Sequence, residues 1–157
     1  MERSHEVFNT IKSCFENQGW TYSLLDREFT LKTGFTNEGK HTDIIIRLDT
    51  EKSLIQIYSD LNFKVPNEKM LDVCIAISIV NPFVANGSFE CNVLEGKVLF
   101  KVAQSYMGGC TVTEELIDYM IAISLVSIQD YSDSLSAIAN GTLELEDFMR
   151  QFYNEKQ

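Results

Sequence analysis

The spacing of apolar side chains changes along this chain, and that change constrains the fold more than any other feature. Within Ser4–Gln18, a helix is predicted because Val7, Ile11 and Phe15 recur four positions apart, and its first residue is expected to cap it. Between residues 20 and 58, short stretches in which apolar and polar side chains alternate, together with the β-rich run Thr42–Leu48, are typical of strands. Short polar turns separate these strands, so neighbouring strands should be antiparallel.

A second helix and a hairpin are predicted in the middle of the chain. Pro66 fits the first turn of a helix, and Asn67–Val80 carries apolar residues around most of its circumference. Such a helix should be covered on more than one side. Residues 87–93 and 97–106 alternate again and flank an acidic–glycine turn, which predicts a hairpin.

Two further helices are predicted toward the end of the chain. Thr111 and Glu114 form a capping box before a long apolar stripe that continues to about Ala139, and Thr142 can cap a final helix. The order is therefore helix, three or four strands, helix, two strands, long helix and short helix. Consecutive strands predict a single α+β domain over residues 1–157 with an antiparallel sheet, and 143–157 as an appended C-terminal helix.

Charge and composition exclude several classes of function. The 157 residues include 23 acidic and 13 basic side chains, a net charge of −10 at pH 7, whereas a nucleic-acid surface needs clustered Lys and Arg. The sequence shows no basic leader followed by an apolar run, and no stretch of about 20 apolar residues. We therefore expect a cytoplasmic protein that binds neither nucleic acid nor membrane.

The cysteines and histidines lack the spacing of a metal site. Zinc ligands usually come in close pairs, whereas the four cysteines lie far apart and only two histidines are present. A disulfide is not expected in a reducing cytoplasm. Three cysteines lie in apolar segments, which predicts buried free thiols: Cys14, Cys74 and Cys91. We predict no metal and no cofactor.

Cys110 is the most enzyme-like residue, because it precedes a helix start, where the helix dipole can activate a thiol. A nucleophile also needs a base within hydrogen-bond reach, and both His5 and His41 are expected in solvated positions. Acidic pairs such as Asp130 and Asp133 are interpreted as exposed helical faces. The chain is therefore predicted not to be an enzyme, and a thiol enzyme centred on Cys110 is the weakest alternative.

Several short strings and their order resemble the YbjN-like family of bacterial sensory transduction regulators. They are Val65–Glu68 at a helix start, Asn81 after that helix, the Gly-x-Phe strand of 87–90, the acidic–glycine turn and strand of 95–101, and Thr113–Leu116 at the start of the long helix. The resemblance implies a fold similar to that of type III secretion chaperones, a two-layer α-β(3)-α-β(2)-α sandwich that is often dimeric. It implies no catalytic residues.

The last predicted helix carries a compact apolar patch within an acidic part of the chain, since residues 104–157 hold nine acidic and two basic side chains. The patch is formed by Leu145, Phe148, Met149 and Phe152. Such a surface favours basic, amphipathic partners. The resulting hypothesis is a non-enzymatic, chaperone-like or regulatory protein that binds a protein segment as a homodimer. The alternative is a small-molecule sensor with a pocket between the sheet and helix Asn67–Val80.

Overall fold

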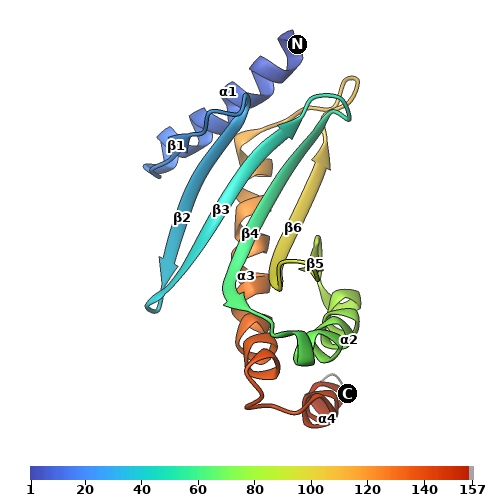
Figure 1. The fold of residues 1–157 in the computed structure, drawn as a ribbon. Helices are drawn as coiled ribbons and strands as arrows, with labels where there is room; N and C mark the ends of the chain where they lie inside the picture. The colour runs from blue at the N-terminus through green and yellow to red at the C-terminus, as the bar shows by residue number, and fades with distance from the viewer. Residues whose placement is uncertain (156–157) are drawn as a thin grey trace.

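One antiparallel sheet runs through the computed structural model, which describes residues 1–155 (Figure 1). Within these residues the six strands lie in the order β1-β2-β3-β4-β6-β5, and each neighbouring pair is antiparallel. The strands are β1 (Ser23–Leu24), β2 (Thr30–Asn37), β3 (Lys40–Asp49), β4 (Leu54–Lys64), β5 (Ser88–Asn92) and β6 (Lys97–Ser105). The predicted α+β class with an antiparallel sheet is confirmed.

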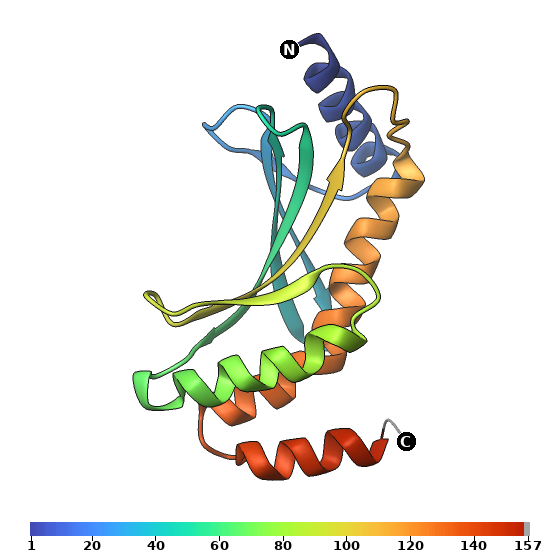
Figure 2. The same cartoon turned by 90° about the vertical axis from the view of Figure 1, so that its right-hand side faces the viewer.

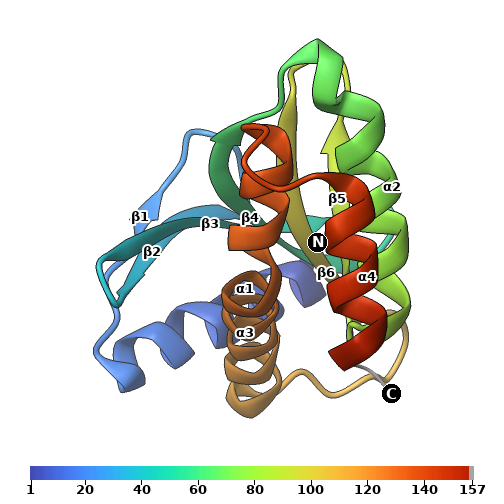
Figure 3. The same ribbon diagram turned by 90° about the horizontal axis from the view of Figure 1, so that it is seen from below.

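Four helices accompany the sheet in the described part of the chain: α1 (Glu2–Gln18), α2 (Met70–Val80), α3 (Glu114–Ala139) and α4 (Leu145–Glu155). Short 3-10 turns, η1 (Asn67–Lys69) and η2 (Asn81–Phe83), flank α2. Helices α1 and α3 lie on one face of the sheet and leave the other face open (Figure 2). Helix α4 lies alongside α2 (Figure 3). None of the described helices combines the length and the apolar character that a membrane span requires.

Alternation along the central strands decides which face of the sheet the helices cover. Ile44 and Ile46 of β3 are fully buried, whereas Ile45 between them is 37% exposed. Ile46 lies opposite Leu31 on β2 and Ile57 on β4, so a row of buried apolar side chains crosses the sheet beneath the helices. Burying each such side chain stabilises the fold by about 1.5–3 kcal/mol, which fixes the register of the strands.

The start of α1 differs from the prediction, because Ser4 does not cap the helix. The helix begins at Glu2, and the buried Ser4 hydroxyl lies 3.1 Å from the Tyr106 hydroxyl, just after β6. A buried hydroxyl needs a hydrogen-bond partner, and here that partner comes from a distant part of the chain. Gly19 follows the helix in the left-handed conformation, with φ of 70°, which is typical of a helix end.

The caps of the last two helices also lie elsewhere than predicted. Thr113, not Thr111, caps α3, and its hydroxyl accepts a hydrogen bond from the Leu116 backbone N–H at 3.3 Å. Thr113 is the residue before the helix and has an extended backbone (φ −111°, ψ 164°), and this conformation aims its hydroxyl at the first turn. The Thr142 hydroxyl donates to the Asn140 side chain at 2.6 Å, and so closes the end of α3 instead of capping α4.

The apolar side of α4 is packed inside the protomer. Phe148 and Phe152 are 4% and 5% exposed, and Leu145 and Met149 are half-buried against the same core. The Phe152 ring centroid lies 5.0 Å from that of Phe83 and 5.6 Å from that of Phe148. The sequence left open whether this patch is core or surface, and the structure places its two phenylalanines in the core. A role for these four residues in binding a partner stays a prediction.

We expect Phe152→Ala to lower the free energy of unfolding by about 3 kcal/mol, because it removes a large ring from a packed site. Tyr153→Ala is the matched control, because Tyr153 is 50% exposed on the same helix and should cost about 0.5 kcal/mol or less. Urea titration followed by circular dichroism measures both. A Phe152→Ala variant with unchanged stability but a changed mass in solution would make α4 an interface instead of core.

Candidate functional site

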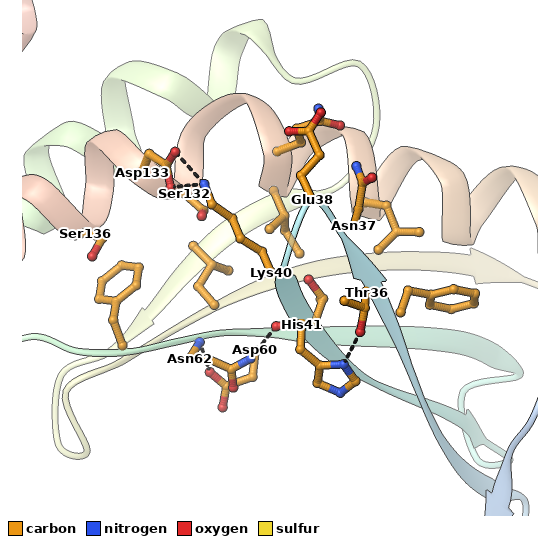
Figure 4. Close-up of a pocket in the computed structure, with 17 residues that line it drawn as sticks. Thr36, Asn37, Glu38, Lys40, His41, Asp60, Asn62, Ser132, Asp133 and Ser136 are labelled. Carbon is orange, nitrogen blue, oxygen red and sulfur yellow. Dashed lines mark hydrogen bonds and ion pairs between the residues drawn. The ribbon is translucent and has the colours of Figure 1, made fainter.

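The candidate site is a cavity of about 530 Å³ at one end of the sheet (Figure 4). The tip of the β2–β3 hairpin, the end of β4 and the second half of α3 form its walls. Apolar side chains from all three walls line it: Phe35, Leu61, Phe63, Leu125 and Ile128. Ligand cavities usually measure about 300–1,000 Å³, so this one can enclose a small molecule or a few side chains of a partner.

An ion pair joins the hairpin tip to α3 across this cavity. Glu38 and Gly39 both have positive φ, 49° and 79°, which gives the tight turn that carries Lys40 toward the helix. The Lys40 Nζ atom lies 2.6 Å from both carboxylate oxygens of Asp133 (Figure 4). The two side chains are 65% and 73% exposed, so the pair contributes about 1 kcal/mol or less. A ligand can therefore displace it at low cost.

The opposite wall of the cavity depends on a bulge in β4. The register of β4 against β6 shifts between Asp60 and Lys64, and Asn62 within this bulge has a positive φ of 59°. The Asn62 side chain donates a hydrogen bond to the His41 carbonyl at 3.0 Å. Its backbone N–H donates to the Asp60 carboxylate at 2.7 Å. The first bond fastens the end of β4 to β3, and the second holds the shape of the bulge within β4.

The cavity combines this apolar lining with a polar rim. Glu38, Asp60 and Asp133 are its acidic residues, and Lys40 and His41 are its basic ones. The His41 ring turns away from α3 and bonds to a threonine hydroxyl of β2 at 2.9 Å (Figure 4). The arrangement can bury apolar groups and bind polar or basic groups at its edge. Within residues 1–155, no group of three or more His, Cys, Asp or Glu is placed to hold a metal ion.

This cavity lies elsewhere than the pocket predicted from the sequence. The sequence predicts a pocket between the sheet and Asn67–Val80, whereas the cavity lies against α3. Two further hollows, on the open sheet face and beside α4, are not lined by that segment either. The sequence signal available for the site was the turn before Lys40. Asp133 was interpreted as part of an exposed helical face, and its partner lies 93 residues away in the chain.

Helix α2 is covered on more than one side, as predicted, yet one apolar strip remains open. The helix contacts β5, α3 and α4, whereas Leu71 and Ile75, one turn apart, are 71% and 37% exposed. Strand β5 beside it is an edge strand of the described sheet, and the Asn81 side chain bonds to the N–H and C=O of Phe89 at this edge, at 2.8 and 3.1 Å. We call Leu71, Ile75 and the edge of β5 the α2–β5 strip. Open apolar groups beside a strand edge are typical of protein-binding surfaces.

Cys110, the most enzyme-like residue of the sequence, has no histidine partner among residues 1–155. The thiol belongs to an exposed residue in the loop before α3, and Arg3 donates to the Cys110 carbonyl at 2.5 Å. His5 bonds through its ring to the Met1 carbonyl at 2.9 Å. His41 lies at the hairpin tip. The residues around Cys110 therefore support a loop tied to α1 more than a nucleophile with its base.

Of the three thiols predicted to be buried, Cys14 is buried and the other two are half-buried where α2 meets β5. Burial, followed by the nearby Cys74 thiol, raises the pKa of Cys91 to about 11 from an ordinary value of 9.0. The Cys91 thiol also donates to the Met70 sulfur at 3.4 Å. Cys91 is therefore a protonated, packed thiol at neutral pH. The prediction of burial is confirmed for Cys14, whereas Cys74 and Cys91 are half-buried instead of fully buried.

The raised pKa of Cys91 predicts a pH window for stability. The thiol has a pKa of 9.0 in the unfolded chain but about 11 in the folded one, so the unfolded chain loses this proton first as pH rises. The free energy of unfolding that depends on this thiol is therefore fully present below pH 9 and falls as pH rises to 11. Cys91→Ala should remove this part of the fall in the free energy of unfolding above pH 9. Cys110→Ala, at an exposed position, should leave the fall as it is in the wild type. Denaturant titrations across this range provide the measurement. Identical pH slopes for the two variants would contradict the assignment.

The comparisons with known proteins show similarity in structure, whereas the sequence matches no family model and no curated protein. YbjN from E. coli, a candidate transcription regulator, is 17% identical, with a TM-score of 0.61 over 85% of this chain and 92% of its own. A chain of the ExsC–ExsE complex is 15% identical, with a TM-score of 0.62 over 84% of this chain and 95% of its own.

A third solved structure extends the similarity to a complex that is named for its chaperone role. A chain of the HopA1–SchA chaperone–effector complex is 9% identical, with a TM-score of 0.58 over 80% of this chain and 91% of its own. All three matches cover most of both chains, so they describe the whole arrangement of helices and sheet. The fold implied by the sequence resemblance is confirmed: this chain has a YbjN-like fold, which is also the fold of the type III secretion chaperones ExsC and SchA.

Proposed function

We propose that this protein is a non-enzymatic, chaperone-like or regulatory protein of the cytoplasm that binds a segment of another protein. The observation that carries the proposal is the cavity beside α3, with its apolar lining, its polar rim and an exposed ion pair across it. Two of the similar structures are complexes, ExsC–ExsE and the chaperone–effector pair HopA1–SchA. They support a protein partner, and none of the three neighbours is named as an enzyme.

The charge of the rim indicates the chemistry of the bound segment. Three carboxylates, those of Glu38, Asp60 and Asp133, line the cavity with Lys40, and residues 104–157 hold nine acidic and two basic side chains. An amphipathic segment with basic residues beside apolar ones fits this site. Its apolar side chains enter the cavity, and one of its Lys or Arg residues takes the place of Lys40 at Asp133.

Leu125→Lys tests the cavity as the binding site. The variant should weaken the binding of basic, amphipathic peptides at least about tenfold, because it removes an apolar contact and adds a repelling charge. Val126→Lys is the control, because it adds the same charge to the neighbouring residue of α3, which is 51% exposed outside the cavity. Peptides are selected on the wild-type protein from a display library and measured by fluorescence anisotropy. Selection of acidic peptides, or equal binding by both variants, would contradict the proposal.

We further propose that two copies associate through the α2–β5 strip. A twofold axis beside α2 brings Leu71 and Ile75 of both protomers together, while the N–H and C=O of Phe89 on the β5 edge stay bonded to the Asn81 side chain. The apolar area that a single protomer leaves open on α2 supports this arrangement. The strip lies apart from the cavity, because none of its residues lines it, so both surfaces can be used at once.

Leu71→Glu should convert a dimer into a monomer, because it places two carboxylates against each other at the twofold axis. The wild-type protein should have a mass of about twice 17.9 kDa by light scattering. Val126→Glu, at an exposed apolar residue of α3, should leave that mass unchanged. A wild-type mass of 17.9 kDa at every concentration would contradict the dimer without affecting the peptide-binding proposal.

A small-molecule sensor is the second candidate function, and the volume of the cavity favours it. About 530 Å³ lies within the range of small-ligand sites, which is about 300–1,000 Å³. A metabolite present at about 100 times its dissociation constant raises stability by about 2.7 kcal/mol, which shifts the melting temperature measurably. Such a shift that is lost in Leu125→Lys would favour the sensor over the peptide-binding protein.

A further inference from the structure

The open face of the sheet holds a second hollow, on the side away from α3. It measures about 560 Å³ and lies among side chains of β2, β3, β4 and β6, on the face toward the viewer in Figure 1. Strand alternation places it there, because the neighbours of buried Ile46 and Ile57 point to the opposite side of the sheet. We call it the sheet-face hollow. Asp60 alone among its lining residues also lines the α3 cavity.

Arg47 lines the sheet-face hollow, and its charge has no carboxylate partner among residues 1–155. Its Nη2 atom donates to the Gln56 amide oxygen at 2.6 Å and to the Tyr58 hydroxyl at 3.1 Å. Its Nε atom is buried and has no hydrogen-bond acceptor among the described residues. Gln56 is only 6% exposed, so it holds the guanidinium in a fixed orientation. The guanidinium also lies over the Tyr58 ring, with its Cζ atom 5.4 Å from the ring centroid. A half-buried cation without a carboxylate partner carries a free-energy cost that an anionic ligand at its accessible edge would lower.

The lysines of the same hollow differ from Arg47 because each has its own carboxylate. The Lys32 Nζ atom lies 3.3 Å from an Asp43 oxygen, and the Lys97 Nζ atom lies 3.8 Å from a Glu95 oxygen. These pairs neutralise most of the charge on this face. The hollow also holds the Asp60 carboxylate, which accepts a hydrogen bond from the Asn62 backbone N–H, and Arg47 is a half-buried cation of this lining without a carboxylate of its own among the residues that the structure describes.

The remaining lining of the hollow adds a second guanidinium and an apolar surface. Arg27 lines it and forms no ion pair within the described part of the chain. Leu25, Ile45 and Leu99 supply apolar area beside the charges. Two unpaired guanidiniums in one hollow are notable in a chain whose net charge is −10. Charge and apolar area together match a ligand with one anionic end and an apolar body.

We propose that the sheet-face hollow binds a small organic carboxylate. The carboxylate bonds to the Nη1 atom of Arg47, because the Nη2 atom already donates to Gln56 and Tyr58 and the Nε atom is buried, and the apolar body lies against Ile45 and Leu99. The hollow is within the size range of small-ligand sites, about 300–1,000 Å³. This site is separate from the segment-binding function proposed above, because it lies on the other face of the sheet.

Titration with benzoate and hexanoate, each compared with its neutral amide, tests the proposal. In ¹⁵N-labelled protein, the Nε–H signal of Arg47 is a direct reporter, because the burial of this atom protects it from exchange with water. Both carboxylates should shift that signal in a saturable way, and benzamide and hexanamide should not. Arg47→Gln should weaken carboxylate binding at least about tenfold. Arg150→Gln, which removes the same charge from a side chain that is 71% exposed on α4, should leave it unchanged.

The controls distinguish binding in the sheet-face hollow from a nonspecific effect of protein charge and from binding in the α3 cavity. No saturable shift with either carboxylate, equal shifts with acid and amide, or equal losses in Arg47→Gln and Arg150→Gln would each overturn the proposal. If Arg47→Gln does not fold, Arg47→Lys replaces it, since it keeps the charge but loses the Nη1 donor whose position Gln56 and Tyr58 fix, and should also weaken binding. Leu125→Lys should bind benzoate as the wild type does, so failure of peptide binding there is distinguishable from failure here.

Discussion

Helix α3 packs its apolar stripe across β4 and β6, and this contact positions the surfaces described above. The helix has 26 residues and is therefore about 39 Å long, enough to extend along the sheet from α1 to the region of α4. Small buried side chains, Ser124 on the helix and Ser59 on β4, let the two elements approach closely. The Ser59 hydroxyl is buried without a hydrogen-bond partner in the described residues, so its small size explains its presence better than its polarity does.

The two walls of the α3 cavity differ in how firmly they are held. The helix wall shares its side chains with the core, as Ile128 shows, because it lines the cavity and is only 7% exposed. The hairpin wall extends to a tip that reaches the helix through the exposed Lys40–Asp133 pair. Separating that pair costs far less than moving α3. The hairpin tip is therefore the part that can adjust to a bound segment, while α3 supplies a fixed surface.

Sequence periodicity predicted the helices and strands well, because the spacing of apolar residues in a segment follows from which of its side chains are buried. It indicated the long helix to Ala139 and the hairpin of β5 and β6, and the short strings around them resemble the family whose fold was found. It could not indicate partners across the chain. Ser4 bonds to Tyr106, 102 residues away, and Lys40 reaches Asp133, 93 residues away. No local pattern marks such pairs, so the role of Ser4 and the position of the cavity were missed.

A strongly acidic chain can still hold a site for an anion, because side chains alternate between the two faces of the sheet. Along β3, Ile44 and Ile46 enter the core, while Asp43, Ile45 and Arg47 face the open side, so the chemistry of one face does not restrict the other. Net charge describes the field far from the molecule and is a sound argument against binding to nucleic acid. At physiological ionic strength that field is screened within about 8 Å. A carboxylate beside Arg47 therefore responds to the nearest guanidinium and its immediate neighbours, and the acidic helices on the far side of the sheet have little effect on it.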